Sequence, residues 1–133
     1  MRSMKNVLSA LVLIFLGASA SLHAQESAGR KELQRADLSG APGMEVILSI
    51  TELKPGDVLP EHFHHGIEAG YIVEGGIMQQ AGKAPVTFAD GASLMNLRDI
   101  MHGGYKVVGT RTIKLITVHV VDKGKPLYDT AKK

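Results

Sequence analysis

The hydrophobic pattern divides the chain into a short apolar N-terminal run and a long part with short apolar or alternating segments. Glycine-rich turns separate these segments, and no segment after residue 24 has a helical repeat. Short strands about ten residues apart predict an all-β barrel or sandwich. The expected strands are 44–53, 71–74, 77–80, 85–88, 92–97 and 112–121.

Turn residues mark the ends of these segments. Lys54-Pro55-Gly56-Asp57 ends the first strand, and Asp90-Gly91 ends the strand at 85–88. Gly75-Gly76 lies between 71–74 and 77–80, which predicts a β-hairpin. The charged stretch 26–35 fits either a flexible lead or an edge strand, and both alternatives stay open.

The N-terminal run has the layout of a secretory signal peptide. Arg2 and Lys5 precede an apolar core at 7–16, and small residues follow at 17–20. We expect cleavage after Ala20 or Ala24; an uncleaved membrane anchor is the alternative. About ten apolar residues are too few for a spanning helix, so we expect a periplasmic or secreted protein without a membrane span after cleavage.

The expected organisation is a signal peptide at 1–24, an N-terminal lead or edge strand at 25–43, a barrel at 44–122 and a C-terminal tail at 123–133. No internal repeat indicates a second barrel. Removal of residues 1–24 leaves 13 basic and 13 acidic side chains. A net charge of zero argues against nucleic acid as a partner. The chain has no cysteine, which excludes disulfides and thiolate ligands.

Three possible metal ligands lie within seven positions. His62 and His64 are two residues apart, so an extended strand directs both imidazoles to the same face. Glu68 follows after a bend at Gly66 that could return its carboxylate to the same point. Imidazole nitrogen and carboxylate oxygen are donors that a divalent transition metal accepts. His102 is the leading candidate for a fourth ligand.

These residues also carry a resemblance to the cupins. The first cupin motif matches at every fixed position: Gly56, five residues, His62-x-His64, three residues, Glu68, six residues and Gly75. The second motif begins at Gly91 and reaches its histidine at His102, with three departures: Leu97 for proline, Asp99 for glycine and Lys106 for asparagine. The resemblance implies a single-domain cupin jelly-roll β-barrel with a divalent metal held by His62, His64, Glu68 and His102.

The remaining histidines and several nearby side chains are not expected to be metal ligands. His65 alternates to the face opposite His64 and is interpreted as structural or as an outer contact of the site. His119 lies in the last strand, where a core or surface histidine is expected, so alanine at His65 or His119 should lower metal occupancy less than alanine at the ligand histidines. Possible pocket residues, which ordinary core or loop positions would also explain, are Tyr71, Met78, Met95, Arg98 and Met101.

Three imidazoles and one carboxylate would leave two positions of an octahedral ion open for water, oxygen or substrate. The resemblance to cupins favours Mn or Fe as the active metal, whereas the nitrogen and oxygen donors also suit Zn, Ni or Cu. We expect a dioxygenase-like oxidoreductase, related to quercetinases or germins, that acts on a small oxygen-rich chelating substrate such as a diketone, enol or dicarboxylate. The alternatives are a non-catalytic metal-binding or small-ligand module of the cell envelope, or a metal-dependent isomerase, lyase or decarboxylase. Kinship also suggests a homodimer formed through edge strands.

Overall fold

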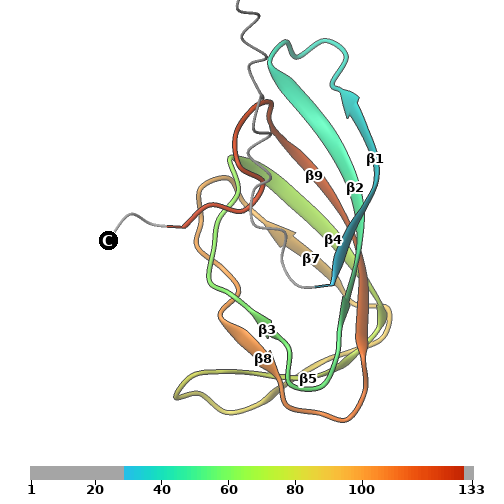
Figure 1. The fold of residues 1–133 in the computed structure, drawn as a ribbon, viewed down its shortest axis with the longest axis vertical. Coiled ribbons are helices and arrows are strands. Elements are labelled where there is room, and N and C mark those ends of the chain that lie inside the picture. The colour runs from blue at the N-terminus through green and yellow to red at the C-terminus, as the bar shows by residue number, and fades with distance from the viewer. Residues whose placement is uncertain (1–28, 131–133) are drawn as a thin grey trace, which may run out of the picture.

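The computed structural model describes residues 29–130, and this part of the chain forms strands without any helix (Figure 1). The strands are β1 (Arg30–Asp37), β2 (Met44–Leu53), β3 (Val58–Leu59), β4 (Gly66–Glu74), β5 (Gly76–Gln80), β6 (Val86–Phe88), β7 (Ser93–Asn96), β8 (Tyr105–Val107) and β9 (Ile113–Asp122). The predicted signal peptide lies outside the described residues. Within those residues no helix has the length and hydropathy that crossing a membrane requires.

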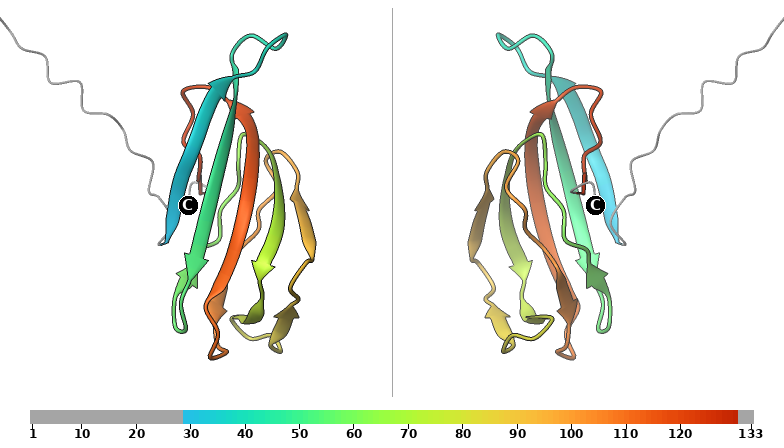
Figure 2. Two further views of the ribbon diagram at one scale, coloured as in Figure 1. Left: turned by 90° about the vertical axis from the view of Figure 1, so that its right-hand side faces the viewer. Right: turned by 90° about the vertical axis from the view of Figure 1, so that its left-hand side faces the viewer.

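Two antiparallel sheets form the barrel. The larger has the strand order β1-β2-β9-β4-β7, and the smaller has the order β3-β8-β5-β6. The left view of Figure 2 looks onto the larger sheet, where strands distant in sequence lie side by side. The predicted all-β jelly-roll class is confirmed.

The longest strands obey the period of two that their sequences predict. In β2 the side chains of Glu45, Ile47, Ser49, Thr51 and Leu53 are buried while their neighbours face outward. β9 lies between β2 and β4 and pairs with both along nearly its whole length. The centre of the larger sheet is therefore fixed by three long strands, and its inner face can carry a defined row of polar groups.

The predicted hairpin at Gly75-Gly76 is wrong. β4 pairs with β7 and β9 in the larger sheet, whereas β5 pairs with β6 and β8 in the smaller one. The glycines form the corner at which the chain passes from one sheet to the other. A Cβ atom on Gly75 would collide with the carbonyl oxygen of Phe88, and the Gly75 N–H donates to Asp90 Oδ1 at 2.6 Å. Glycine is needed here for close approach of two chain segments.

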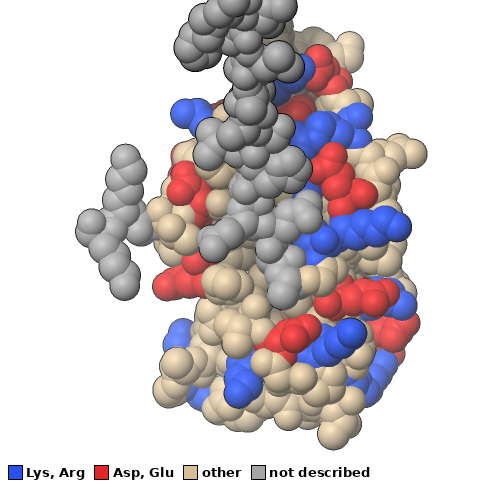
Figure 3. Space-filling model, viewed as in Figure 1, with Lys and Arg blue, Asp and Glu red and all other residues tan. Residues whose placement is uncertain are grey.

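The charged segment near the N-terminus forms an edge strand. β1 pairs with β2, with a bulge between Glu32 and Gln34. Arg35 binds Glu32 at 2.8 Å and Glu45 at 2.6 Å. Positive and negative side chains lie side by side over this edge, with no field of one sign on the face that Figure 3 shows. Charges on an edge strand discourage pairing with a further strand.

Two apolar clusters line the interior. One contains Leu53, Met78, Val107 and Ile113, and the other contains Ile47, Val121 and Leu127 with Tyr128 packed against it. The second cluster depends on the segment after β9, which folds back so that Phe63 and Asp129 exchange backbone hydrogen bonds. The residues expected to form a C-terminal tail thus include part of the core.

Candidate metal centre

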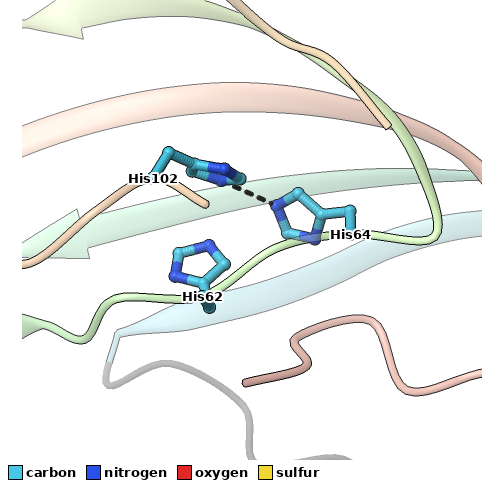
Figure 4. Close-up of side chains that lie close together, drawn as sticks. All are labelled: His62, His64 and His102. Atoms are coloured by element: carbon cyan, nitrogen blue, oxygen red, sulfur yellow. Dashed lines mark hydrogen bonds between the residues drawn. The ribbon is translucent and has the colours of Figure 1, made fainter. Parts of the chain in front are cut away.

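Backbone pairing brings the two histidine segments together. His62 and His102, which are 40 positions apart in the sequence, exchange N–H···O=C bonds of 2.9 and 2.8 Å as an isolated β-bridge. Gly103 follows with φ of +85°, and a Cβ there would meet the Pro60 carbonyl oxygen at 2.5 Å. Only glycine allows this close approach with this backbone conformation. The rings of His62, His64 and His102 consequently converge (Figure 4).

The turn before His102 departs in sequence from the cupin motif but is joined to the first motif segment. Asp99, which stands where the motif has glycine, has φ of +60° and is the single non-glycine residue with positive φ in the described part of the chain. Aspartate tolerates this left-handed conformation better than most residues. Its N–H donates to the His64 carbonyl at 2.9 Å, which ties the turn to the first motif.

Glu68 reaches the same point from the larger sheet. The cross-strand register places Ile47, His119, Glu68 and Asn96 in one row across β2, β9, β4 and β7. Because directly paired residues project to the same face, His119 and Asn96 flank the carboxylate. Asn96 Nδ2 donates to Glu68 Oε2 at 2.7 Å, and His119 Nε2 lies 3.3 Å from Oε1.

Backbone carbonyl groups set the orientation of three imidazoles. Nδ1 of His62 donates to Pro60 O at 2.7 Å, Nδ1 of His102 donates to Ile100 O at 2.9 Å, and Nδ1 of His64 donates to Leu127 O. A carbonyl oxygen only accepts hydrogen bonds, so the proton of each neutral ring resides on Nδ1. Each Nε2 therefore presents a lone pair to the interior, as a metal ligand must.

The facing atoms fit a cation. His64 Nε2 lies 3.2 Å from His102 Nε2, and Glu68 Oε2 lies 3.3 and 3.4 Å from these two nitrogens. Three lone-pair donors at these separations repel one another unless a positive charge lies among them. Adjacent ligands of an octahedral ion with bonds of roughly 2.1 Å are about 3 Å apart, which is close to the observed spacing.

The charge state of the metal-free cluster follows from burial and hydrogen bonds. Burial raises the pKa of Glu68, but the imidazoles of His102, His119 and His64 beside the carboxylate outweigh this effect and hold the pKa below its ordinary value. Burial lowers the pKa of His62 to about 4, and it also lowers that of His119. For His102, burial is outweighed by the bonds to Glu68 and the Ile100 carbonyl, which raise its pKa. Glu68 thus favours the protonated form of His102 when no metal is bound.

The structure brings together all four residues predicted as ligands. It also places His119 beside them, next to the Glu68 carboxylate. Two groups have their donor atoms within 4.8 Å of one another: His62, His64 and His102, and His64, Glu68 and His119. His119 is fully buried, and neither ring nitrogen has a hydrogen-bond partner among the described residues. Strand alternation in β9 could have placed His119 on the inner face. Its pairing with Glu68 spans 51 positions and leaves no local signal.

His65 lies outside the cluster, as its alternation with His64 predicts. Its Nε2 contacts Asp129 Oδ2 at 2.9 Å and its Nδ1 contacts Asp99 Oδ1 at 3.4 Å. These contacts connect the first motif to the C-terminal segment and to the turn before His102. His65 supports the loops around the site and donates nothing to its centre.

A cavity of about 350 Å³ adjoins the centre at His102 and Asn96. Met78 and Met101 line it, as the sequence suggested. Three other predicted pocket residues lie elsewhere. Tyr71 and Met95 are 53% and 62% exposed on the outer face of the larger sheet, because strand alternation turns them away from the barrel. Arg98 forms an ion pair with Asp122 at 2.8 Å on the surface.

The pKa of His62 predicts how the stability of the metal-free protein depends on pH. The folded state resists protonation of His62 until about pH 4, whereas the unfolded chain accepts the proton near 6.5. The contribution of His62 to the free energy of unfolding is complete above pH 6.5 and is lost as the pH falls toward 4. Denaturant titration at several pH values, with chelator present, measures the free energy of unfolding. Between pH 6.5 and 4 this free energy should fall more steeply for the native sequence than for His62→Asn.

Equal slopes for the native protein and His62→Asn would contradict the neutral, buried state of His62.

Comparison with known proteins supports the fold at low sequence identity. Neither a protein-family model nor a curated protein sequence matches the chain. Among solved structures, it resembles an uncharacterised conserved protein with a double-stranded β-helix domain from Klebsiella pneumoniae, with 13% identity and a TM-score of 0.58 over 84% of this chain and 92% of that one.

Two further structures extend this likeness. A cupin domain from Bordetella pertussis has 12% identity and a TM-score of 0.50 over 71% of this chain and 96% of that one. The polyketide cyclase RemF from Streptomyces resistomycificus has 20% identity and a TM-score of 0.52 over 79% and 76% of the two chains. The described part of this chain has the cupin fold, a double-stranded β-helix closed into a jelly-roll barrel.

Proposed function

We propose that the protein binds one divalent transition metal and is an oxidoreductase of the dioxygenase type that acts on a small oxygen-rich chelating substrate. The observation that carries this proposal is the convergence of the Nε2 atoms of His64 and His102 with the Glu68 carboxylate, at 3.2 to 3.4 Å from one another. The secreted location stays a prediction from the N-terminal sequence.

The ligand set would comprise His62, His64, Glu68 and His102. Asn96 fixes Oε2 of the carboxylate, and His119 lies against Oε1, so the two outer residues limit rotation of Glu68. Such supporting contacts tune the affinity of a metal site. Nitrogen and oxygen donors without sulfur suit Mn or Fe, which we favour for activity, and also accept Zn, Ni or Cu.

A bound ion would supply a positive charge that lowers the pKa of a chelated enol and an open position for oxygen. The residues of the chain would hold the ligands in place and exclude water. The Tyr128 ring lies 4.5 Å from the His62 ring and 5.1 Å from the His64 ring, and so covers the centre on the side of the C-terminal segment. The cavity beside His102 and Asn96 offers room for a substrate on another side.

A non-catalytic metal-binding or small-ligand module is the second candidate. It is favoured by the cavity lining, because His102 and Tyr105 are the only titratable side chains among the lining residues in the described part of the chain. A reaction that needs a separate general acid or base would have few groups to use.

Metal titration of purified variants tests the ligand set. Alanine at His62, His64, Glu68 or His102 should weaken binding of Co²⁺ or Mn²⁺ by at least about 100-fold, because each change removes a donor. Alanine at His119 or Asn96 should weaken it by about 10-fold through loss of support for Glu68. This keeps the order expected from the sequence, in which His119 matters less than the ligand histidines, and adds a supporting contact with Glu68.

His65→Ala is the control and should weaken metal binding less than any of these changes, with circular dichroism to establish folding of every variant. Unchanged affinity in His102→Ala would remove the second motif from the site and contradict the ligand set.

Oxygen uptake tests the proposed reaction. The protein reconstituted with Fe²⁺ or Mn²⁺ should consume oxygen when supplied with diketone or enol substrates, and Glu68→Gln should consume less than about one-hundredth as much. A well-loaded protein that consumes no oxygen with any such substrate would favour the binding module.

We also propose that the protein forms a homodimer through the outer face of the larger sheet, and not through the edge strands that the sequence suggested. The outer apolar face consists of Leu48, Ile67, Tyr71, Met95, Ile116 and Val118, of which four are exposed. These residues span about five positions on four strands, roughly 17 by 19 Å or about 320 Å², and would form the apolar centre of an interface of the standard size of roughly 800 Å² per partner. β1, by contrast, carries paired charges at the edge.

Light scattering after size-exclusion chromatography should give the mass of a dimer for the native protein and of a monomer for Ile67→Glu. Val58→Glu changes an exposed apolar residue of the smaller sheet and should remain dimeric. A monomeric native protein at micromolar concentration, or a dimeric Ile67→Glu, would contradict this interface.

A further inference from the structure

We propose that the substrate carries its chelating oxygens at one end of an apolar body that has no other charged group, and that this body occupies the cavity beside His102. This inference rests on the proposed function and narrows its substrate class. It excludes the dicarboxylates and retains diketones and enols with alkyl or aryl substituents.

The composition of the cavity wall is the first argument. Ten of its residues are aliphatic, aromatic or methionine: Leu53, Leu59, Ile72, Met78, Phe88, Leu94, Met101, Tyr105, Ile113 and Leu115. No lysine, arginine, aspartate or glutamate lines the cavity among residues 29–130. A ligand group in this space therefore meets apolar surface on nearly every side.

The position of the polar residues is the second argument. Asn96 and His102 mark one end of the cavity, and both contact Glu68. Gln80 is already engaged, because its Nε2 donates to Gly103 O at 2.8 Å and its Oε1 accepts from Lys83 Nζ at 2.9 Å. Polar recognition is thus concentrated at the metal centre, and the remainder of the wall has one hydroxyl group, on Tyr105.

The energetic consequence concerns a second charge. A carboxylate inside the cavity would lose its hydration without gaining a cationic partner, which is strongly unfavourable. An alkyl or aryl body instead gains free energy in proportion to the apolar area that it buries. The centre would bind the chelating head, and the wall would select an uncharged body.

The size of the cavity sets an upper bound on that body. At about 350 Å³ it lies near the lower end of small-molecule sites, which span roughly 300–1,000 Å³. With about 30 Å³ for each water-sized group, it holds about a dozen such groups. A phenyl ring with a short diketone fits this volume, whereas a nucleotide or an oligosaccharide does not.

Three probes with the same chelating head separate these effects. Acetylacetone, benzoylacetone and 4-carboxybenzoylacetone would be titrated calorimetrically into the Co²⁺-loaded and the metal-free protein, with each affinity divided by that for the free ion. We expect benzoylacetone to bind the loaded protein at least about 10-fold more tightly than acetylacetone, and the carboxylated probe to lose that advantage. Each probe should bind the metal-free protein more weakly than it binds the Co²⁺-loaded protein.

A pair of variants on one strand assigns the effect to the cavity. Leu59 lines the cavity, whereas its neighbour Val58 is 52% exposed and lies outside it. Leu59→Trp should fill the space and abolish the preference for benzoylacetone while metal affinity and acetylacetone binding are kept. Val58→Trp adds the same side chain outside the cavity and should behave as the native protein.

The outcomes distinguish this inference from the proposed function. Failure to bind metal, or to bind any diketone when loaded, would reject the proposed function and the inference with it. If the loaded protein binds all three probes with equal affinity, the inference about the substrate body is wrong, whereas the proposed function still stands. If benzoylacetone binds the metal-free protein as tightly as the loaded protein, the inference is also wrong, because the chelating oxygens would then not bind the ion.

Discussion

The interaction on which the structure depends is the one between the buried Glu68 carboxylate and the imidazoles around it. A carboxylate this deep in an apolar barrel is costly unless a positive charge compensates it. Two Nε2 lone pairs directed at one another and at the same carboxylate oxygen add to the cost. A proton on His102 can relieve part of it, and a divalent ion can relieve all of it. Metal binding at this centre would therefore be coupled to the stability of the fold.

The fold supplies this arrangement through pairing between distant segments. The bridge between His62 and His102 joins the two motif segments, and the row across the larger sheet brings His119 and Asn96 to the sides of Glu68. The C-terminal segment completes the enclosure with the Leu127 carbonyl and the Tyr128 ring. The apolar clusters on either side of the centre hold these pairings in register.

Features with local signals were predictable from sequence. Alternation and flanking turn residues define β2 at Met44–Leu53, and the spacing of His62, His64 and Glu68 indicates shared chemistry. Features that depend on non-local pairing were not predictable. β3 and β8 are two and three residues long, too short for a pattern, and Gly75-Gly76 could equally signal a hairpin or a corner. Alternation could have placed His119 inward, but only the register of β9 with β4 reveals its contact with Glu68.

The central claim is that one ion is held by side chains from both halves of the barrel. The most direct test is a crystal structure of the Mn²⁺-loaded protein with anomalous scattering. The account predicts a single anomalous peak within bonding distance of His62, His64, Glu68 and His102. A peak at another position, such as the contact of His65 with Asp99 and Asp129, or a His102 ring turned away from the ion, would contradict it.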